Sequence, residues 1–160
     1  MKQYGPTKKT NKDGYTGLGT NSLTSRYDSY DIFDMDPCIK ALVPKIFNLH
    51  NKFLKALNIP LPSHISIKGW ANVLRKGESV KAHLHDVSPY AYLEGNIPIQ
   101  CNNTSTFYIN PVDQINDPEV LETKNQVGLL TLFPSILPHY TNKHTSSEER
   151  ITIAFGLTPR

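Results

Sequence analysis

The feature that most restricts the fold is a change in the sequence pattern after residue 62, where short apolar runs alternate with turn residues. Runs rich in β-branched and aromatic residues are typical of strands, and Gly, Asn and Pro between them are typical of turns. We expect strands at His64 to Leu74, Val80 to His85, Tyr90 to Leu93, Ile97 to Cys101, Thr106 to Ile109, Val127 to Phe133 and Arg150 to Leu157. Short strands that follow a helical segment predict a β-sandwich or small barrel, mainly β, with helices packed outside it.

The helical segment is expected at residues 36–58. Asp36-Pro37 has the residues of a helix start, with Asp as the N-cap and Pro at the first helical position. Apolar residues from Ile39 to Leu57 recur mostly at three- and four-residue spacing, which indicates an amphipathic helix. Pro44 has no amide hydrogen, so it should kink this helix or split it in two.

The length of 160 residues favours one domain with a core of its own. Residues 1–20 are poor in apolar side chains and contain several lysines and glycines, so we expect a flexible basic arm there. The domain should then span 21–160, with the β core at 63–158. The formal charge is only +3, and basic residues do not interleave with aromatic ones, so no nucleic-acid partner is expected.

The cysteines and the hydropathy bear on the compartment. Cys38 and Cys101 match no metal-ligand or redox spacing, and we interpret them as free thiols in a reducing cytoplasm. No apolar stretch is long enough to cross a membrane, and the first residues lack the apolar core of a signal peptide. The expectation is a cytoplasmic protein without a membrane partner.

Three histidines and one arginine are the residues of this sequence that most clearly indicate a functional site. His83 and His85 are two residues apart, so on a strand their side chains project from the same face. His139 follows the apolar run that ends at Phe133, and Arg150 opens the last strand-like run. Imidazole suits iron, zinc, copper and nickel, and such a set leaves coordination positions open, as catalytic metal sites do. Taken alone, His-x-His is also typical of an exposed strand; His139 and Arg150 favour the metal site.

Arg150 and Thr152 also share one face of a predicted strand. A guanidinium can bind a carboxylate through two parallel hydrogen bonds, and the hydroxyl adds a further donor. A buried arginine without an anion would be costly, so a bound acid is the expected counter-charge. The alternative is a surface salt bridge with Glu148 or Glu149, which would stabilise the protein little.

Together, these residues resemble the Fe(II)- and 2-oxoglutarate-dependent oxygenases, whose pattern is His-x-Asp/Glu, a distal His and then Arg-x-Ser/Thr. More narrowly, Trp70 to Phe155 is similar to a group of 2-oxoglutarate oxygenases common in bacteriophages. The shared motifs are Trp70-Ala71-Asn72, His83-Leu84-His85, Ser88, Tyr92-Leu93, Gly128 to Ser135, His139 and Arg150-Ile151-Thr152. The resemblance implies a double-stranded β-helix, which is a distorted, cupin-like jelly roll, and a viral oxidoreductase in the cytoplasm of the host.

Carried over residue by residue, the resemblance implies that His83 and His139 bind Fe(II), and that Arg150 and Thr152 hold the distal carboxylate of 2-oxoglutarate. Tyr92 and Asn72 fall where the superfamily often places side chains that contact this co-substrate; the alternatives are a core tyrosine and an asparagine paired with backbone. The implied reaction is an O2-dependent hydroxylation that needs no catalytic residue beyond the metal ligands. By analogy, the substrate is a peptide or protein, with prolyl residues as candidates.

His85 departs from the family pattern, because most members carry an acid at this position. An imidazole there would make the site three-histidine and more positive. Asp86 would supply the carboxylate only through a β-bulge, since adjacent strand residues point to opposite faces. Otherwise, His85 turns outward or the site is weakened. A second departure is Pro89, where the group usually has glycine.

Two other functions are compatible with these residues. One is a three-histidine metal dioxygenase on a cupin-like barrel, without 2-oxoglutarate. The other is a non-catalytic double-stranded β-helix module of a phage, whose histidines would bind metal poorly. Arg150 and Thr152 favour the oxygenase, because a cupin does not require this anion contact. Residues 1–35 and 110–124 are candidate lids over the mouth of the barrel.

Overall fold

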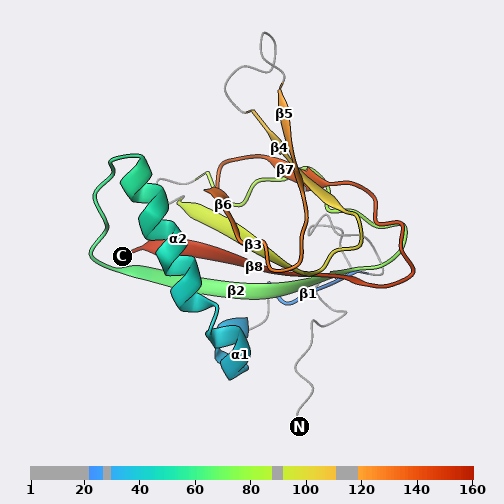
Figure 1. Ribbon diagram of the computed structural model, residues 1–160, viewed down its shortest axis with the longest axis horizontal. Coiled ribbons are helices and arrows are strands. Elements are labelled where there is room, and N and C mark those ends of the chain that lie inside the picture. Colours follow the sequence, from blue (N-terminus) through green and yellow to red (C-terminus); the bar gives the residue numbers. More distant parts are fainter. Residues whose placement is uncertain (1–21, 27–29, 88–91, 111–118) are drawn as a thin grey trace.

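The computed structural model describes residues 22–26, 30–87, 92–110 and 119–160. Two antiparallel sheets and an N-terminal helical segment make up this part of the chain (Figure 1). The arm expected at 1–20, the Ser88 motif position and Pro89 lie outside the described residues. Among the helices that are described, none has the length and apolar character needed to pass through a bilayer.

The helical segment begins where Asp36 and Pro37 predict. After the short 3-10 helix η2 (Ile32–Asp34), helix α1 spans Pro37–Lys40, and the Asp36 carboxylate accepts a hydrogen bond from the Cys38 amide at 2.7 Å. Helix α2 spans Val43–Ala56 and has Pro44 in its first turn, where no amide hydrogen is needed. The proline therefore begins a second helix and does not kink a single one.

The larger sheet has the strand order β1-β2-β8-β3-β6. Its strands are β1 (Leu23–Thr24), β2 (Ile65–Leu74), β8 (Arg150–Pro159), β3 (Leu93–Gln100) and β6 (Thr131–Pro134). The two longest, β2 and β8, pair along their whole lengths, which places Asn72 opposite Thr152 and Trp70 opposite Ala154. Because side chains alternate between the faces of a sheet, these four residues share one face.

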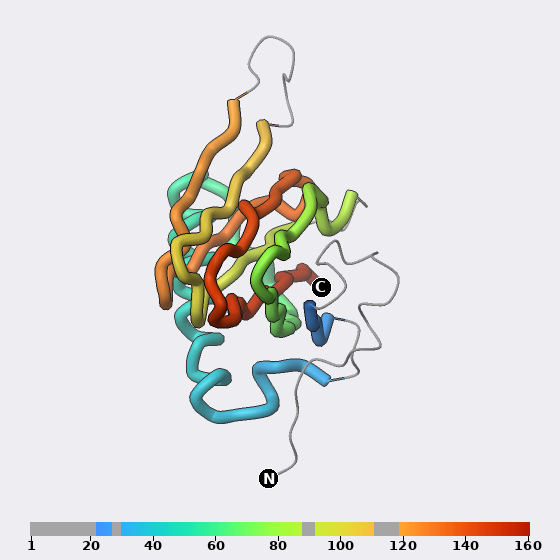
Figure 2. The backbone as a smooth tube through the Cα atoms, turned by 90° about the vertical axis from the view of Figure 1, so that its right-hand side faces the viewer, coloured from blue at the N-terminus to red at the C-terminus, as the bar shows by residue number. Residues whose placement is uncertain are grey.

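The smaller sheet has the order β5-β4-β7, with β4 at Ser105–Ile109, β5 at Val120–Lys124 and β7 at His139–Thr141. Strands β4 and β5 form a hairpin that projects from the rest of the molecule (Figures 1 and 2). The end of the segment proposed as a lid, 120–124, therefore pairs with β4 as a strand, and 111–118 lie outside the described residues.

Two sequence predictions about strands are wrong. Glu94-Gly95-Asn96 is not a turn: it lies within β3, which joins the two strands expected on either side. Gly95 is needed there because an added Cβ would collide with the Phe155 ring. The segment from Val80 to His85 is not a strand either; it makes only an isolated β-bridge, between His83 and His139.

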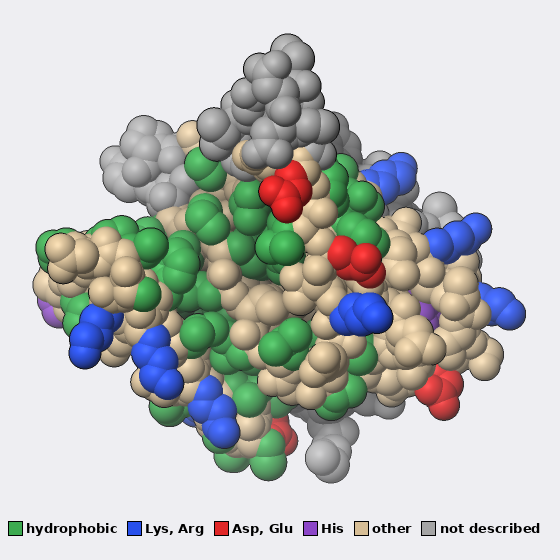
Figure 3. Space-filling model, turned by 45° about the horizontal axis from the view of Figure 1, so that its top comes forward, with side chains coloured by type: hydrophobic (Ala, Val, Ile, Leu, Met, Phe, Trp, Pro, Cys, Tyr) green, Lys and Arg blue, Asp and Glu red, His purple; other side chains and the backbone are tan. Residues whose placement is uncertain are grey.

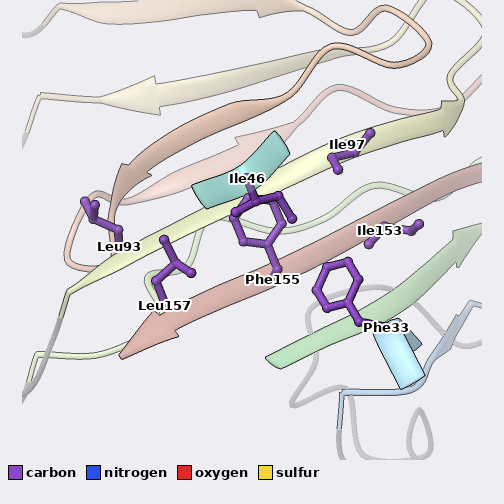
Figure 4. Packing of buried hydrophobic residues seen from close by; sticks show 7 residues of the cluster. All are labelled: Phe33, Ile46, Leu93, Ile97, Ile153, Phe155 and Leu157. Atoms are coloured by element: carbon purple, nitrogen blue, oxygen red, sulfur yellow. The ribbon is translucent and has the colours of Figure 1, made fainter. Parts of the chain in front are cut away.

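The hydrophobic core lies between α2 and one face of the larger sheet (Figure 4). Ile46 of α2 and Phe155 of β8 are both 0% exposed, and burial of such side chains stabilises a fold by about 1.5–3 kcal/mol each. The buried members of the cluster are Phe33, Ile46, Leu93, Ile97, Ile153, Phe155 and Leu157. The mainly β architecture with a helical segment packed outside the sheet is thus confirmed.

The molecular surface in Figure 3 carries hydrophobic, neutral and charged side chains intermixed. Lysine and arginine side chains on this face are dispersed and form no continuous basic area.

Candidate metal centre

Three imidazoles meet on the face of the larger sheet that is opposite α2. The possible ligand atoms of His83, His85 and His139 all lie within 4.8 Å of one another. The ring centroid of His139 is 4.4 Å from that of His83 and 5.0 Å from that of His85. Among the described residues, no carboxylate belongs to this group, so Asp86 does not complete it. His85 faces the other two rings and does not turn outward.

Backbone hydrogen bonds explain how a segment without regular structure holds two of these rings in place. The His83 amide donates to the His139 carbonyl at 3.1 Å, and the His139 amide donates to the His83 carbonyl at 2.9 Å. The His85 amide donates to the Ser135 carbonyl at 3.0 Å. These bonds fix the segment against β7 and the turn before it, so the imidazoles converge without a continuous strand.

The Nδ1 atoms of His83 and His139 each contact a backbone carbonyl. The His83 atom lies 2.8 Å from the Lys81 oxygen, and the His139 atom lies 2.9 Å from the Leu137 oxygen. A carbonyl only accepts, so Nδ1 must carry the hydrogen and Nε2 keeps its lone pair. Histidines that bind metals usually have one ring nitrogen occupied in this way.

His85 has a carboxylate where the other two histidines have a carbonyl. Its Nδ1 lies 3.0 Å from Oε2 of Glu94, and the two side chains are only 6% and 13% exposed. Glu94 is on β3 and was not singled out in the sequence. The two atoms are within hydrogen-bond distance, although their directions in this structure are not those of a hydrogen bond.

Burial lowers the pKa of all three imidazoles. Desolvation is the main cause in each, and it brings the pKa of His85 and of His139 to about 3; repulsion from His83 adds to the shift at His139. The histidines are therefore neutral at pH 7, which is the form that binds metals. Burial also raises the pKa of Glu94 to about 8. Without a metal the Glu94–His85 contact thus joins neutral groups, and the distance alone does not make it an ion pair.

The imidazoles open onto a cavity of about 410 Å³, a volume in the range of small-molecule sites. Strands β2 and β8 supply much of its wall through side chains on the face opposite the core. Neither Asp nor Glu is among the described residues that line it. Its polar and aromatic lining includes Arg26, Trp70, Asn72, His83, His85, Asn96, Phe133, His139, Arg150 and Thr152.

Arg150 is a buried cation in this cavity, only 4% exposed. Its Nε donates to Thr104 Oγ1 at 3.2 Å. Burial lowers its pKa to about 10, so it keeps its charge at neutral pH. Glu149 instead pairs with Arg75 at the surface, at 2.9 Å, so the surface salt bridge considered for Arg150 is not formed there.

Thr152 and Asn72 lie beside Arg150 in the cavity wall. Thr152 is 4% exposed, and its Oγ1 has no hydrogen-bond partner within the described part of the chain. Asn72 accepts a hydrogen bond from the Thr24 hydroxyl at 2.6 Å through Oδ1. A charged donor, an unpartnered hydroxyl and an amide therefore face the same cavity.

Tyr92 is not among the described residues that line the cavity, and the co-substrate contact predicted for it stays a prediction. Its hydroxyl lies 2.7 Å from Nε2 of His50, a buried histidine of α2. Tyr92 precedes the first residue of β3, so the alternation of that strand does not direct it, and its ring packs against the apolar core.

Arg26, Glu94 and Asn96 are residues near the site that the sequence did not reveal. The Arg26 guanidinium carbon lies 4.8 Å from the centroid of the Trp70 ring, in the cavity wall. Asn96 projects from β3 opposite Ala154 of β8. Glu94 and Asn96 fall between two of the predicted strands, where the sequence favours a turn. A strand assignment would have revealed them, because residues two apart on a strand share a face.

Comparison with known proteins identifies the family. Residues 68–156 match the family described as "Putative 2OG-Fe(II) oxygenase". Comparison with curated proteins gave no match. Among solved structures, a prolyl-4-hydroxylase from Pseudomonas putida superposes with a TM-score of 0.58 at 14% identity, over 79% of this chain and 70% of that one.

Two further structures are less similar. A 2OG-Fe(II) oxygenase family oxidoreductase from Burkholderia pseudomallei has a TM-score of 0.49 at 15% identity, over 60% of this chain and 45% of that one. A cupin domain from Bordetella pertussis has a TM-score of 0.40 at 13% identity, over 62% of this chain and 91% of that one.

At 14% identity, the likeness to the prolyl-4-hydroxylase shows the fold alone, and it confirms the predicted jelly roll. The family match extends from β2 to β8 and covers more than half of the chain. It includes the three clustered histidines, Arg150 and Thr152. The chain belongs to this family of 2OG-Fe(II) oxygenases.

Proposed function

We propose that this protein is an Fe(II)- and 2-oxoglutarate-dependent dioxygenase whose metal ligands are His83, His85 and His139. The observation that carries the proposal is the convergence of three neutral imidazoles, within 4.8 Å, on a cavity that also holds the buried cation of Arg150. Imidazole nitrogen is a suitable donor for iron, so the residues fit the metal that the family implies.

Arg150 and Thr152 are the proposed contacts for the distal carboxylate of 2-oxoglutarate. A buried guanidinium needs an anion, and a carboxylate can accept two parallel hydrogen bonds from it. The Thr152 hydroxyl, which lacks a partner among the described residues, would donate a further hydrogen bond. Asn72 stands opposite Thr152 on β2 and is a third proposed contact.

The bound iron and 2-oxoglutarate would supply the activation of O2 for hydroxylation of the substrate. The protein's own residues provide position and shielding. Nδ1 of His83 and of His139 is occupied by backbone, which leaves Nε2 for the metal. The Phe133 ring lies 4.7 Å from that of His139 and packs against this side of the cluster.

A peptide or protein is the proposed substrate, with a prolyl residue as one candidate. The support is the fold shared with a prolyl-4-hydroxylase, which is an argument from fold and not from the residues of the site. The phage origin and the cytoplasmic location stay predictions.

The three-histidine set also favours a second candidate, a metal dioxygenase that uses no 2-oxoglutarate. The two candidates differ at Arg150. In the second, its guanidinium would bind the substrate itself or serve only to contact Thr104.

Anaerobic titration with Fe(II) and then 2-oxoglutarate tests the proposal. We expect a visible charge-transfer band only when both are present, together with a higher melting temperature. Iron binding without a band or any stabilisation by 2-oxoglutarate would favour the second candidate. No binding of iron would favour the non-catalytic module.

A further inference from the structure

The three histidines of the cluster differ in what contacts Nδ1. Backbone carbonyls contact His83 and His139, whereas Glu94 of β3 contacts His85 at 3.0 Å. The two carbonyls belong to the backbone, whereas the contact to His85 depends on a single side chain.

The sheet leaves space for the Glu94 side chain. Gly156 of β8 pairs with Glu94, and a Cβ at Gly156 would lie 2.9 Å from Glu94 Oε1 and 3.2 Å from its Cδ. Any larger residue at position 156 would displace the carboxylate. On the other side, Glu94 pairs with Phe133 of β6, whose ring centroid lies 6.3 Å from that of His85. The neighbours of Glu94 thus direct it towards His85.

Glu94 does not belong to the group of ligand atoms that lie within 4.8 Å of one another. It therefore reaches the centre through His85 and not as a ligand. We propose that Glu94 is a positioning residue, whose carboxyl group accepts the Nδ1 hydrogen of His85 and directs Nε2 to the metal. The inference rests on the proposed metal site.

Zinc and cobalt affinities of the purified protein test this inference, measured by competition with a chromophoric chelator. Removal of such a carboxylate typically weakens metal binding about 10–100-fold, and we expect this loss in Glu94→Ala. Glu94→Gln should lose less, because its amide oxygen can still accept from Nδ1. Glu122→Gln is the matched control: Glu122 lies on β5, accepts from Ser105 Oγ at 2.6 Å, and should leave the affinity unchanged.

Proton NMR of the zinc-loaded protein gives a readout that a merely structural role would not move. The Nδ1 hydrogen of His85 should exchange slowly in the wild type and fast in Glu94→Ala. Those of His83 and His139, which are bound to backbone carbonyls, should exchange equally in both proteins. A general loosening of the site would instead affect all three hydrogens.

The outcomes separate this inference from the proposed function. If Glu94→Ala binds zinc as tightly as the wild type, the inference is wrong and the metal site stands. If Glu94→Gln loses metal as completely as His83→Ala, then Glu94 is a ligand and its positioning role is wrong. If the wild type binds neither metal, the proposed function and the inference fall together.

Discussion

Burial has different consequences on the two faces of strand β8. Ile153, Phe155 and Leu157 belong to the apolar cluster that includes Ile46 of α2, whereas Arg150 and Thr152 are buried to a similar extent on the cavity side. The apolar face lowers the free energy of the folded protein by removing carbon from water. The polar face carries a cation, Arg150, and the Thr152 hydroxyl, which has no hydrogen-bond partner among the described residues and so costs stability unless a ligand supplies one. Burial alone therefore does not distinguish a structural residue from a functional one, because both faces of β8 are buried to a similar extent.

The largest effect expected on the cavity side is loss of the metal. In His83→Ala one of three ligands is missing, and iron binding should be abolished while the fold is kept, because the ring belongs to the cavity and not to the core. Equilibrium dialysis with Fe(II) under argon measures this. His64→Ala is the control, since His64 is exposed and lies outside the cluster. Undiminished iron binding by His83→Ala would contradict the ligand assignment.

On the core side, Phe155→Ala should lower the free energy of unfolding by about 3–5 kcal/mol. Phe155 is 0% exposed, and its ring occupies the space that Gly95 leaves free, so its removal creates a cavity. Urea denaturation measures the loss. At temperatures where the variant is folded, its affinity for iron should equal that of the wild type. If Phe155→Ala instead had weakened iron binding and unchanged stability, Phe155 would serve the metal site and not the core, and the two faces would not differ in the way described.

Arg150→Ala should leave the affinity for the metal unchanged and weaken the binding of 2-oxoglutarate. A hydrogen bond to a charged group contributes about 1.5–3 kcal/mol, which corresponds to about 10–150-fold in affinity. Calorimetric titration of 2-oxoglutarate into the protein loaded with zinc measures it. Arg75→Ala is the control, because Arg75 pairs with Glu149 at the surface. Equal affinities in Arg150→Ala and the wild type would contradict the proposed anion contact.

The pH dependence of stability also separates the two faces of β8, because the histidines whose pKa is lowered lie on the cavity side. Desolvation lowers the pKa of His85 and His139 to about 3, below the ordinary value of 6.5. The unfolded chain therefore binds protons between pH 6.5 and 3 that the folded protein does not, so the metal-free protein should lose stability as pH falls through this range. Glu94, whose pKa is raised to about 8 from 4.5, acts oppositely, since the folded protein retains its proton between these values.

Urea denaturation of the metal-free protein at pH 7 and pH 5 measures this dependence. His139→Gln should show a smaller drop than the wild type, because one of the buried neutral imidazoles is gone. Phe155→Leu, a change on the core side, should keep the full drop. If His139→Gln showed the same drop as the wild type, His139 would titrate as it does in the unfolded chain, and its assignment as a buried neutral imidazole would be wrong.

The pattern of residues within single segments was enough to predict the helical segment, two long strands and several of the residues that line the cavity. The N-cap at Asp36, the strands at β2 and β8 and the pairing of Arg150 with Thr152 on one face all follow from spacing that a single segment contains. Glu94 could not be found this way. Its neighbours Gly95 and Asn96 resemble a turn, and only packing against Phe155, which is distant in sequence, explains why glycine occupies a strand. The same holds for Tyr92, whose direction depends on His50 of α2.

The smallest effect, and the sharpest test of the contrast, comes from two adjacent residues of β8. In Ile153→Val a buried methylene is lost on the core side, which should lower the free energy of unfolding by about 0.5–1.5 kcal/mol. In Thr152→Val a hydroxyl without a described partner is replaced by a methyl group of similar size, and the metal-free protein should be as stable as the wild type or more so.

For 2-oxoglutarate affinity the order of the two variants should be reversed: Thr152→Val should be affected and Ile153→Val should not. Thr152→Val loses one neutral hydrogen bond, about 0.5–1.5 kcal/mol or about 2–13-fold in affinity, and Ile153→Val loses none. Urea denaturation and calorimetric titration of the two variants measure both quantities on proteins that differ at neighbouring positions. If Thr152→Val were destabilised like Ile153→Val and bound 2-oxoglutarate normally, the Thr152 hydroxyl would be structural, because its loss would then affect only the fold. A stable Thr152→Val protein with weakened 2-oxoglutarate binding would instead show that this hydroxyl is kept for the ligand at no benefit to the fold.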